Sequence, residues 1–206
     1  MSNFRKLPAL LGSIKTTTRR HLSRGALAGG FNKEGLKRWA AQEWHNDTAR
    51  TGCNDKTGEL YVDMFSHSLT KECATWLDTH RSPSIELGKS YFGSNHFLPE
   101  RIGLTPFFYQ HSDMPTRFEQ SDSFLVWTVA VRAPLEIICT WNGPFRGCTM
   151  LAFDPKLRKV FHGTCIHTAS TSPLQKSLTP FHIRYSKFLL TGMVQQLENE
   201  ALKLKS

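Results

Sequence analysis

The segment 123–167 alternates short apolar runs with turn residues, and this pattern constrains the fold more than any other feature of the chain. The turns are Arg132-Ala133-Pro134, Asn142-Gly143-Pro144 and Asp154-Pro155-Lys156. Such residues interrupt a strand and reverse the chain, so neighbouring runs predict hairpins and the series predicts an antiparallel sheet. Strands are predicted at 104–110, 117–119, 123–132, 135–141, 147–153 and 159–167.

The chain before this series is expected to add one strand and one helix. Residues 59–69 begin with alternating apolar side chains, which predicts a strand. Thr70 is a favourable N-cap and Glu72 lies in the first turn after it, which predicts a helix from residue 70 toward residue 80. Residues 81–103 are rich in Pro, Gly and Ser, so we expect a loop with one helical turn there.

After Pro173 the apolar period becomes helical and stays so to the end of the chain. A strand, a helix, consecutive antiparallel strands and a long C-terminal helix make an α+β domain in which the helix lies across a curved sheet. That order is the helix-grip arrangement of START-like and polyketide-cyclase-like proteins, and it predicts a cavity between the concave face and the helix. The stripe expected to face the sheet is Leu178, Phe181, Tyr185, Phe188, Leu189, Gly192 and Gln196.

Two stretches carry a resemblance to a known family. They are Lys-Val-Phe-His-Gly-Thr at 159–164 and Leu-Thr-Pro-Phe-His-Ile-Arg-Tyr-Ser-Lys-Phe-Leu-Leu at 178–190. Together they resemble the end of a family of uncharacterised, mostly bacterial proteins, in which a strand with an aromatic residue and glycine precedes a helix that begins Pro-Phe-His. The resemblance is loose over the rest of the body, and residues 1–50 have no counterpart in that family. It implies a START-like fold for 59–206 and a role in binding a small apolar molecule.

The net charge of +9 is distributed very unevenly along the chain. Residues 1–33 contain no Asp or Glu and seven basic residues, which leaves 9 − 7 = +2 for residues 34–206. A nucleic-acid-binding protein needs a basic face on its folded surface, so the nearly neutral body predicts that nucleic acid is not a partner. The basic residues of the arm are Arg5, Lys6, Lys15, Arg19, Arg20, Arg24 and Lys33.

The basic segment 1–33 has the composition of a mitochondrial targeting arm. It combines Lys, Arg, Ser and Thr with apolar residues at helical spacing, and it lacks the compact apolar core of a secretory signal. In a eukaryotic source this predicts the mitochondrial matrix, whereas in a bacterial source we expect a cytoplasmic protein. The alternatives are a basic tail without an address and an arm that makes peripheral contact with anionic lipid. Residues 34–58 are expected to be a connector with a short helix near 34–45.

Several classes of chemistry have no motif in this sequence. We find no Gly-x-Ser-x-Gly, no Gly-rich phosphate loop with Lys-Ser/Thr, no Gly-x-Gly-x-x-Gly and no His-Glu-x-x-His. No cofactor is therefore expected, and no apolar run reaches the roughly 20 residues of a membrane-spanning helix. The five cysteines are odd in number and scattered, which favours free thiols in a reducing compartment.

The candidate ligand-binding residues on the sheet are Trp127, Trp141, His162 and His167. The two tryptophans are predicted to form a cross-strand pair on one face, which suits either a core or a cavity wall. An odd spacing on a strand places His162 and His167 on opposite faces, so we expect no metal site. Either histidine also fits a structural role as a partly buried, hydrogen-bonded side chain.

The candidate ligand-binding residues on the C-terminal helix are Phe181, Tyr185 and Phe188. Their spacing predicts that all three face the sheet, where the Tyr185 hydroxyl would project into the cavity. The same spacing is equally expected of a helix that only packs.

Three functions remain open at this level. The first is binding of a lipid or other apolar small molecule in the cavity, in mitochondria. The second is a cavity enzyme, of the cyclase or isomerase type, that uses a His or Tyr as acid or base. The third is a non-catalytic interaction or assembly factor whose own side chains fill the cavity.

Overall fold

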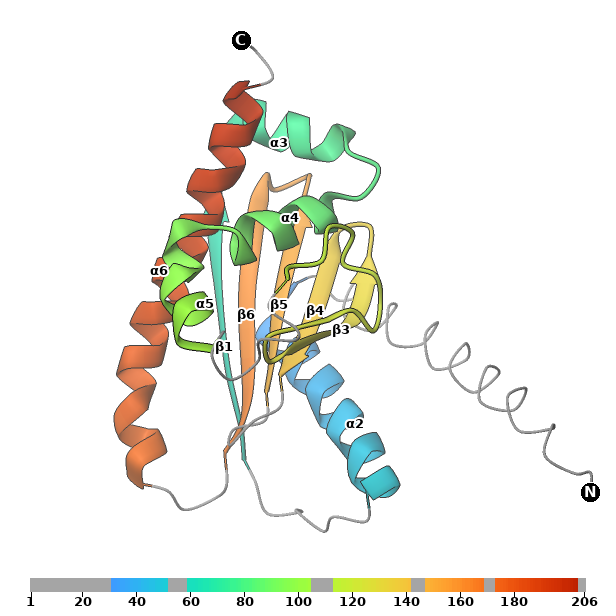
Figure 1. Cartoon of the computed structure of the whole chain (residues 1–206), viewed down its shortest axis with the longest axis vertical. Helices are drawn as coiled ribbons and strands as arrows, with labels where there is room; N and C mark the ends of the chain where they lie inside the picture. Colours follow the sequence, from blue (N-terminus) through green and yellow to red (C-terminus); the bar gives the residue numbers. More distant parts are fainter. Residues whose placement is uncertain (1–30, 52–58, 105–112, 142–146, 169–172, 204–206) are drawn as a thin grey trace, which may run out of the picture.

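A computed structural model describes residues 31–51, 59–104, 113–141, 147–168 and 173–203, so the prediction of a targeting arm falls almost entirely outside the described residues. The described chain is an α+β fold built on a curved, six-stranded antiparallel sheet (Figure 1). Its elements are α2 (Lys33–Thr51), β1 (Glu59–Ser68), α3 (Lys71–Thr79), α4 (Pro83–Phe92), η1 (Asn95–Phe97), α5 (Leu98–Leu104), β2 (Ser123–Phe124), β3 (Trp127–Ala133), β4 (Glu136–Trp141), β5 (Gly147–Asp154), β6 (Lys159–Thr168) and α6 (Pro173–Lys203).

The sheet has the strand order β1-β6-β5-β4-β3-β2, with every neighbouring pair antiparallel. The hairpins predicted between residues 123 and 167 are confirmed. The first strand of the sheet pairs along its whole length with the last, from Glu59↔Thr168 to Ser68↔Lys159. This pairing brings the helix that follows β6 next to β1.

The predicted strand 123–132 is two strands rather than one. A two-residue turn separates β2 from β3, and Phe124 pairs directly with Trp127 across it. Leu125 in this turn has a φ of 47°, the left-handed conformation that such tight reversals require. Sequence periodicity missed the turn because its two residues, Leu125 and Val126, are apolar.

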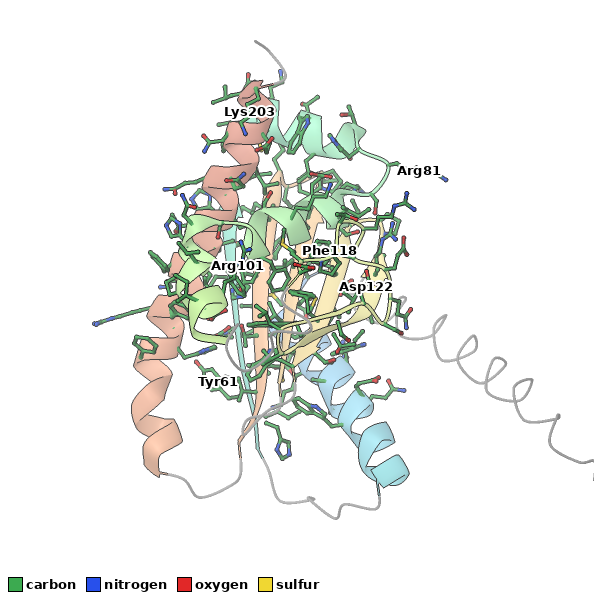
Figure 2. The ribbon with its side chains drawn as sticks, in the orientation of Figure 1. Tyr61, Arg81, Arg101, Phe118, Asp122 and Lys203 are labelled. Carbon is green, nitrogen blue, oxygen red and sulfur yellow. The ribbon has the colours of Figure 1, made fainter. Side chains whose placement is uncertain are left out.

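The prediction of a strand at 117–119 is wrong, because this segment dips into the core instead of pairing. Phe118 has a φ of 49° and its side chain is fully buried. Its ring rests on Gly88 of α4, where an added Cβ would lie 3.1 Å from three ring atoms. Figure 2 shows Phe118 among the side chains between the sheet and the helices. The strand predicted at 104–110 overlaps the end of α5 at Leu104, and its other residues lie outside the described part of the chain.

The loop expected at 81–103 is instead two helices joined by a 3₁₀ turn. Pro83 occupies the first turn of α4, where its missing N–H costs nothing. Ser84, Gly88 and Ser90 suggested a loop, but all three lie on the buried side of α4 and permit close packing. The start of α4 is tied to the β3–β4 turn by a hydrogen bond from the Ser84 amide to the Pro134 carbonyl, 3.0 Å long.

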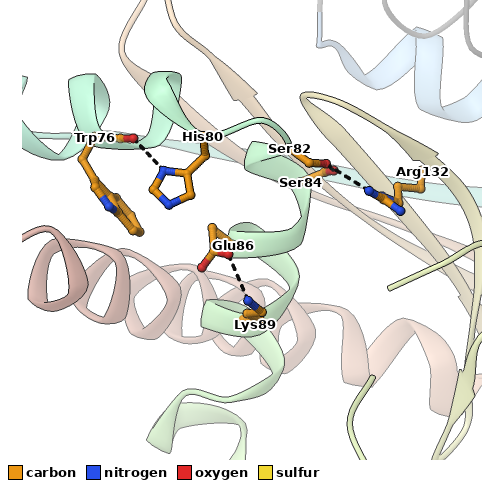
Figure 3. A network of polar contacts seen from close by, with 7 residues as sticks. All are labelled: Trp76, His80, Ser82, Ser84, Glu86, Lys89 and Arg132. Carbon is orange, nitrogen blue, oxygen red and sulfur yellow. Dashed lines mark hydrogen bonds and ion pairs between the residues drawn. The ribbon is translucent and has the colours of Figure 1, made fainter. Parts of the chain in front are cut away.

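A polar network surrounds this junction of α3, α4 and β3 (Figure 3). The Arg132 guanidinium is 3.5 Å from the Ser82 hydroxyl and also forms a 2.6 Å ion pair with Glu119. On α4, Lys89 and Glu86 form a second ion pair of 3.0 Å. The Arg132–Ser82 contact links β3 to the N-cap of α4, whereas the Lys89–Glu86 pair lies within the helix.

Helix α2 is longer than the predicted short helix, and it packs on the sheet instead of forming a connector. It runs from Lys33 to Thr51 and covers the face of the sheet opposite α4 and α6 (Figure 1). We call this the outer face. Gly163 of β6 permits the approach, since an added Cβ would lie 2.8 Å from a Leu36 methyl group. The buried core of this layer is Leu36, Trp39, Ala40, Ile138, Cys148, Met150 and Cys165.

Helices α3, α4 and α6 cover the inner face, and a block of aromatic side chains fills the β2–β3 side of it. Phe92 lies at the centre of the block, with ring centroids of Phe97, Phe118, Phe124 and Trp127 between 4.7 and 5.9 Å from its own. These five rings are buried. This half of the inner face is therefore occupied by the protein's own side chains.

The long C-terminal helix is confirmed, and the predicted stripe is correct in part, because Tyr185 and Leu189 pack on the core whereas its two phenylalanines do not. Phe181 and Phe188 were expected to face the sheet and are 66% and 46% exposed. The buried side is set instead by the aliphatic second half of the helix, which places Ser186 and His182 toward the sheet. The residues that pack there are Leu189, Leu190, Met193, Val194, Leu197 and Ala201.

Four of the cysteines, Cys73, Cys139, Cys148 and Cys165, are free and buried as expected, and Cys53 lies outside the described residues. Among the described helices, none is long and apolar enough to cross a membrane.

Candidate functional site

A row of polar side chains crosses the inner face of the sheet. Asp63 of β1 is paired with Thr164 of β6, Thr164 with Thr149 of β5, and Thr149 with Cys139 of β4. Residues opposite one another in an antiparallel ladder point to the same face, so the four side chains form one continuous band. All four are buried, with Asp63 only 2% exposed. Polar groups at this depth need partners, and their concentration marks the band as a candidate site.

His162 and Tyr91 lie beside the band. The Tyr91 hydroxyl is 3.0 Å from His162 Nε2, and the two rings stack with centroids 5.1 Å apart. Burial lowers the pKa of His162 to about 4, so the imidazole is neutral, and burial raises the pKa of Tyr91 well above its ordinary value. When the phenol donates to Nε2, the imidazole proton lies on Nδ1, which has no hydrogen-bond partner among the described residues.

The ring of His182, from α6, pairs with Asp63, which is the only carboxylate of the band. Its Nε2 is 3.0 Å from Asp63 Oδ2, while Asp63 Oδ1 has no hydrogen-bond partner in the described chain. Ser186 Oγ lies 3.4 Å from the same Nε2. In a nucleophilic triad the acid and the serine contact different ring nitrogens, so this arrangement does not activate Ser186. It holds a histidine in a fixed orientation with its Nδ1 pointing away from Asp63.

Glu100 of α5 and Tyr185 of α6 close the cluster on the helix side. Burial raises the pKa of Glu100 to about 7, although the hydrogen bond from the Tyr185 hydroxyl and the nearby His182 partly oppose that rise. Burial, the Glu100 charge and the same hydrogen bond raise the pKa of Tyr185. A carboxyl that titrates near neutral pH can both donate and accept a proton under ordinary conditions. We name Asp63, Tyr91, Glu100, His162, His182 and Tyr185 the acid–base cluster.

A tryptophan pair lies one row further along the same face. Trp127 and Trp141 are directly opposite in β3 and β4, which confirms the predicted cross-strand pair. The Trp141 ring lies over Gly147 of β5, where an added Cβ would approach within 2.4 Å of it. Neither indole N–H has a hydrogen-bond partner among the described residues. The row continues through Gly147 to Ile166 and Tyr61, so flat apolar surface borders the polar band.

The structure brings together four of the seven predicted site residues. Trp127, Trp141 and His162 lie on the inner face, and Tyr185 joins them from α6. His167 lies on the outer face, where its ring is 5.4 Å from that of Trp44, so its assignment to this site is wrong. As predicted, His162 and His167 face opposite sides of the sheet.

Phe181 and Phe188 do not line the inner face. They are exposed on the outward side of α6, where both rings stack on Tyr185 with centroids 5.8 and 6.1 Å away. Their assignment as residues of an internal cavity is therefore also wrong. The cavity itself stays a prediction.

Sequence reasoning missed Asp63, Tyr91, Glu100 and His182 as site residues. A usable signal existed for Asp63, because Tyr61, Asp63 and Phe65 alternate with the apolar residues of the outer face and place one acid between two aromatic residues. No comparable signal existed for Tyr91 or Glu100, since both lie in the stretch that was expected to be a loop. Their positions depend on α4 and α5.

The cluster offers proton donors, proton acceptors and flat apolar surface, but no described group of three or more His, Cys, Asp or Glu side chains has the arrangement of a metal site. It is thus equipped to bind a molecule with polar and apolar parts, and to move protons on it. Comparison of the chain with family models, with curated proteins and with solved structures found no match, so the inner-face geometry is what remains to indicate a function.

Proposed function

We propose that the protein binds a lipid or another small, largely apolar molecule that carries polar groups, on the inner face between β1, β6 and α6. The observation that carries this proposal is a set of buried polar atoms without hydrogen-bond partners in the described chain, all on one face. They are Asp63 Oδ1, Glu100 Oε2, His162 Nδ1 and, beside the aromatic block, Trp141 Nε1. Leaving such an atom unpartnered costs about 1–3 kcal/mol, so a bound molecule that satisfied several of them would gain substantially.

The donors and acceptors in this set indicate the chemistry of the ligand. The carboxyl oxygens of Asp63 and Glu100 can accept hydrogen bonds and favour a ligand hydroxyl or amine, whereas the Trp141 indole N–H favours a carbonyl or ether oxygen. The Trp141 ring suits a flat or long apolar body. A molecule with an apolar body, a hydroxyl group and a carbonyl group fits all three requirements.

The helix-grip fold is part of the proposal. It is supported by the pairing of β1 with β6 and by the position of α6 immediately after β6, which is the order expected of START-like proteins. A mitochondrial location is likewise proposed, on the composition of residues 1–33.

A second function, acid–base catalysis on the bound molecule, is favoured by one specific contact. The 3.0 Å pair of Asp63 and His182 fixes an imidazole whose Nδ1 is available as a base, and Tyr185 with Glu100 is placed to donate. A proton shift within the ligand, as in an isomerase or cyclase, needs such a base and such a donor.

Native mass spectrometry of the full chain purified from its host tests the binding proposal. We expect an adduct that disappears on denaturation and that is lost in Asp63→Asn. Trp39→Phe on the outer face is the matched control and should retain the adduct, since Trp39 Nε1 is also buried without a partner but lies across the sheet. An adduct retained by Asp63→Asn but lost in Trp39→Phe would place the ligand on the wrong face for this proposal.

A further inference from the structure

We infer that the outward face of α5 and α6 is a docking surface for an anionic lipid bilayer, formed by the folded body and distinct from the basic arm. The inference does not depend on the proposed ligand site, because vesicle binding is measured without any ligand. The residues that support it include Phe181 and Phe188, which were predicted to face the sheet and are exposed instead.

Large apolar side chains gather on this face although they are not needed for packing. Phe181 and Phe188 of α6 are 66% and 46% exposed, and Leu98 and Ile102 of α5 are exposed as well. The two helices are joined here, because the His96 ring of η1, two residues before Leu98, lies 4.2 Å from the Phe188 ring. Figure 1 shows α5 beside α6 on the same side of the sheet. An exposed apolar cluster of this kind marks an interaction surface.

The charges around these side chains have one sign. The stretch 173–197, most of α6, contains no Asp or Glu, while Arg184 is exposed on α6 and Arg101 is exposed on α5. The Lys187 ammonium lies over the Phe65 ring of β1 instead, 5.3 Å from its centroid. Glu100 is the one acid of α5, and its carboxyl is turned toward Tyr185 rather than outward. The face therefore combines aromatic and aliphatic side chains with cations.

An anionic bilayer is the occupant that fits both features. Helices that lie at a membrane surface present aromatic and aliphatic residues to the acyl boundary and Lys or Arg to the phosphates. A second copy of this chain would bring like charges together across the same face, which disfavours a symmetric dimer here. The chain also offers a matched comparison, since Leu157 is 58% exposed and lies in the turn between β5 and β6 rather than on α5 or α6.

Flotation of the full-length protein with vesicles tests the inference. One vesicle set is phosphatidylcholine alone, and in the other a part of it is replaced by phosphatidylglycerol. We expect the protein to float with the second set, and Phe181→Ser combined with Phe188→Ser to weaken that binding by about tenfold or more, because two ring contacts with the acyl boundary are lost. The control, Leu157→Ser, should float like the parent protein.

The arm needs its own variant, because six cations in residues 1–30 can also attract anionic lipid. In a full chain carrying Arg19→Gln, Arg20→Gln and Arg24→Gln, the two Phe→Ser substitutions should still reduce flotation. The inference is overturned if the Phe→Ser protein floats as well as the parent, if the arm variant abolishes all binding, or if the parent does not float with anionic vesicles. Both Phe side chains are exposed, so the thermal midpoint should hardly change, and it verifies that each variant is folded.

Discussion

Replacing Glu100 by glutamine tests separately how this carboxyl affects the free energy of unfolding and how it affects ligand binding. Burial raises the pKa of Glu100 from 4.5 to about 7. Between these two values the unfolded chain has released the proton and the folded chain still holds it, so the contribution of this carboxyl to stability falls as the pH rises. Above pH 7 the folded protein carries an ionised carboxylate in an unfavourable place. Glutamine keeps the shape of the side chain and can still accept the Tyr185 hydrogen bond, but it has no charge.

The size of the effect follows from the pKa change. A rise from 4.5 to about 7 corresponds to about 3 kcal/mol at pH 8, and partial exposure of the side chain reduces this to about 1–2 kcal/mol. Glu100→Gln should therefore raise the free energy of unfolding by that amount at pH 8 and by less than about 1 kcal/mol at pH 5. Urea unfolding at the two pH values measures both quantities, and ligand binding is followed in parallel.

Glu136→Gln is the matched control. Burial also raises the pKa of Glu136 to about 7, but this residue, at the start of β4, is 1% exposed and alternates with inner-face Ile137, which places it on the outer face. It should gain stability at pH 8 without any change in ligand binding, whereas Glu100→Gln should bind more weakly. If Glu100→Gln instead loses stability at pH 8, a cation or donor holds the carboxylate and its role is structural. If binding is unchanged, Glu100 does not belong to the ligand site.

Three further predictions concern packing and pairing. His182→Ala leaves the Asp63 carboxylate buried without its partner and should lower the free energy of unfolding by about 3 kcal/mol in urea, with partial recovery when Asp63→Asn is added; additive losses would mean that the two residues are not coupled. Gly147→Ala forces the Trp141 ring away and should cost about 1–3 kcal/mol together with a shift in tryptophan emission, and an unchanged spectrum would show that the ring does not lie over Gly147. Phe118→Ala empties a fully buried site and should cost about 3–5 kcal/mol, whereas a loss below about 1 kcal/mol would mean that Phe118 is not inserted in the core.

The sheet was predictable because turn chemistry is local. Pro134 lies in the turn between β3 and β4, and Asp154 accepts two backbone hydrogen bonds in the turn between β5 and β6. The alternation within β6 placed His162 and His167 on opposite faces. The turn between β2 and β3 was missed because it uses Leu125 and Val126, which read as strand residues. Local patterns thus predicted the strands, except in the β2–β3 turn, where residues typical of strands adopt a turn conformation.

The helices were less predictable because the same small residues are common both in loops and in closely packed helices. Ser84, Gly88 and Ser90 are typical of a loop, yet in α4 they allow close packing on the core, and Gly88 makes room for Phe118. The predicted inward-facing stripe of α6 was partly wrong for a related reason. Large aromatic residues were expected to face inward, whereas the smaller aliphatic residues after Phe188 determine the buried side. Missing α4 and α5 also meant missing Tyr91 and Glu100, so half of the missed cluster residues lie in one stretch of chain.

Both faces of the sheet carry an apolar core, and the inner face also carries the polar band. On the outer face, Leu36, Trp39 and Ala40 of α2 pack against Ile138 and Met150. On the inner face, the aromatic block around Phe92 forms a second core. These layers can offset the polar band, whose unpartnered buried atoms each cost about 1–3 kcal/mol. Selection for stability alone would replace such groups by apolar ones, because apolar replacement of buried polar groups is often neutral or stabilising. Their concentration on the inner face is therefore the physical argument for the binding site proposed between β1, β6 and α6.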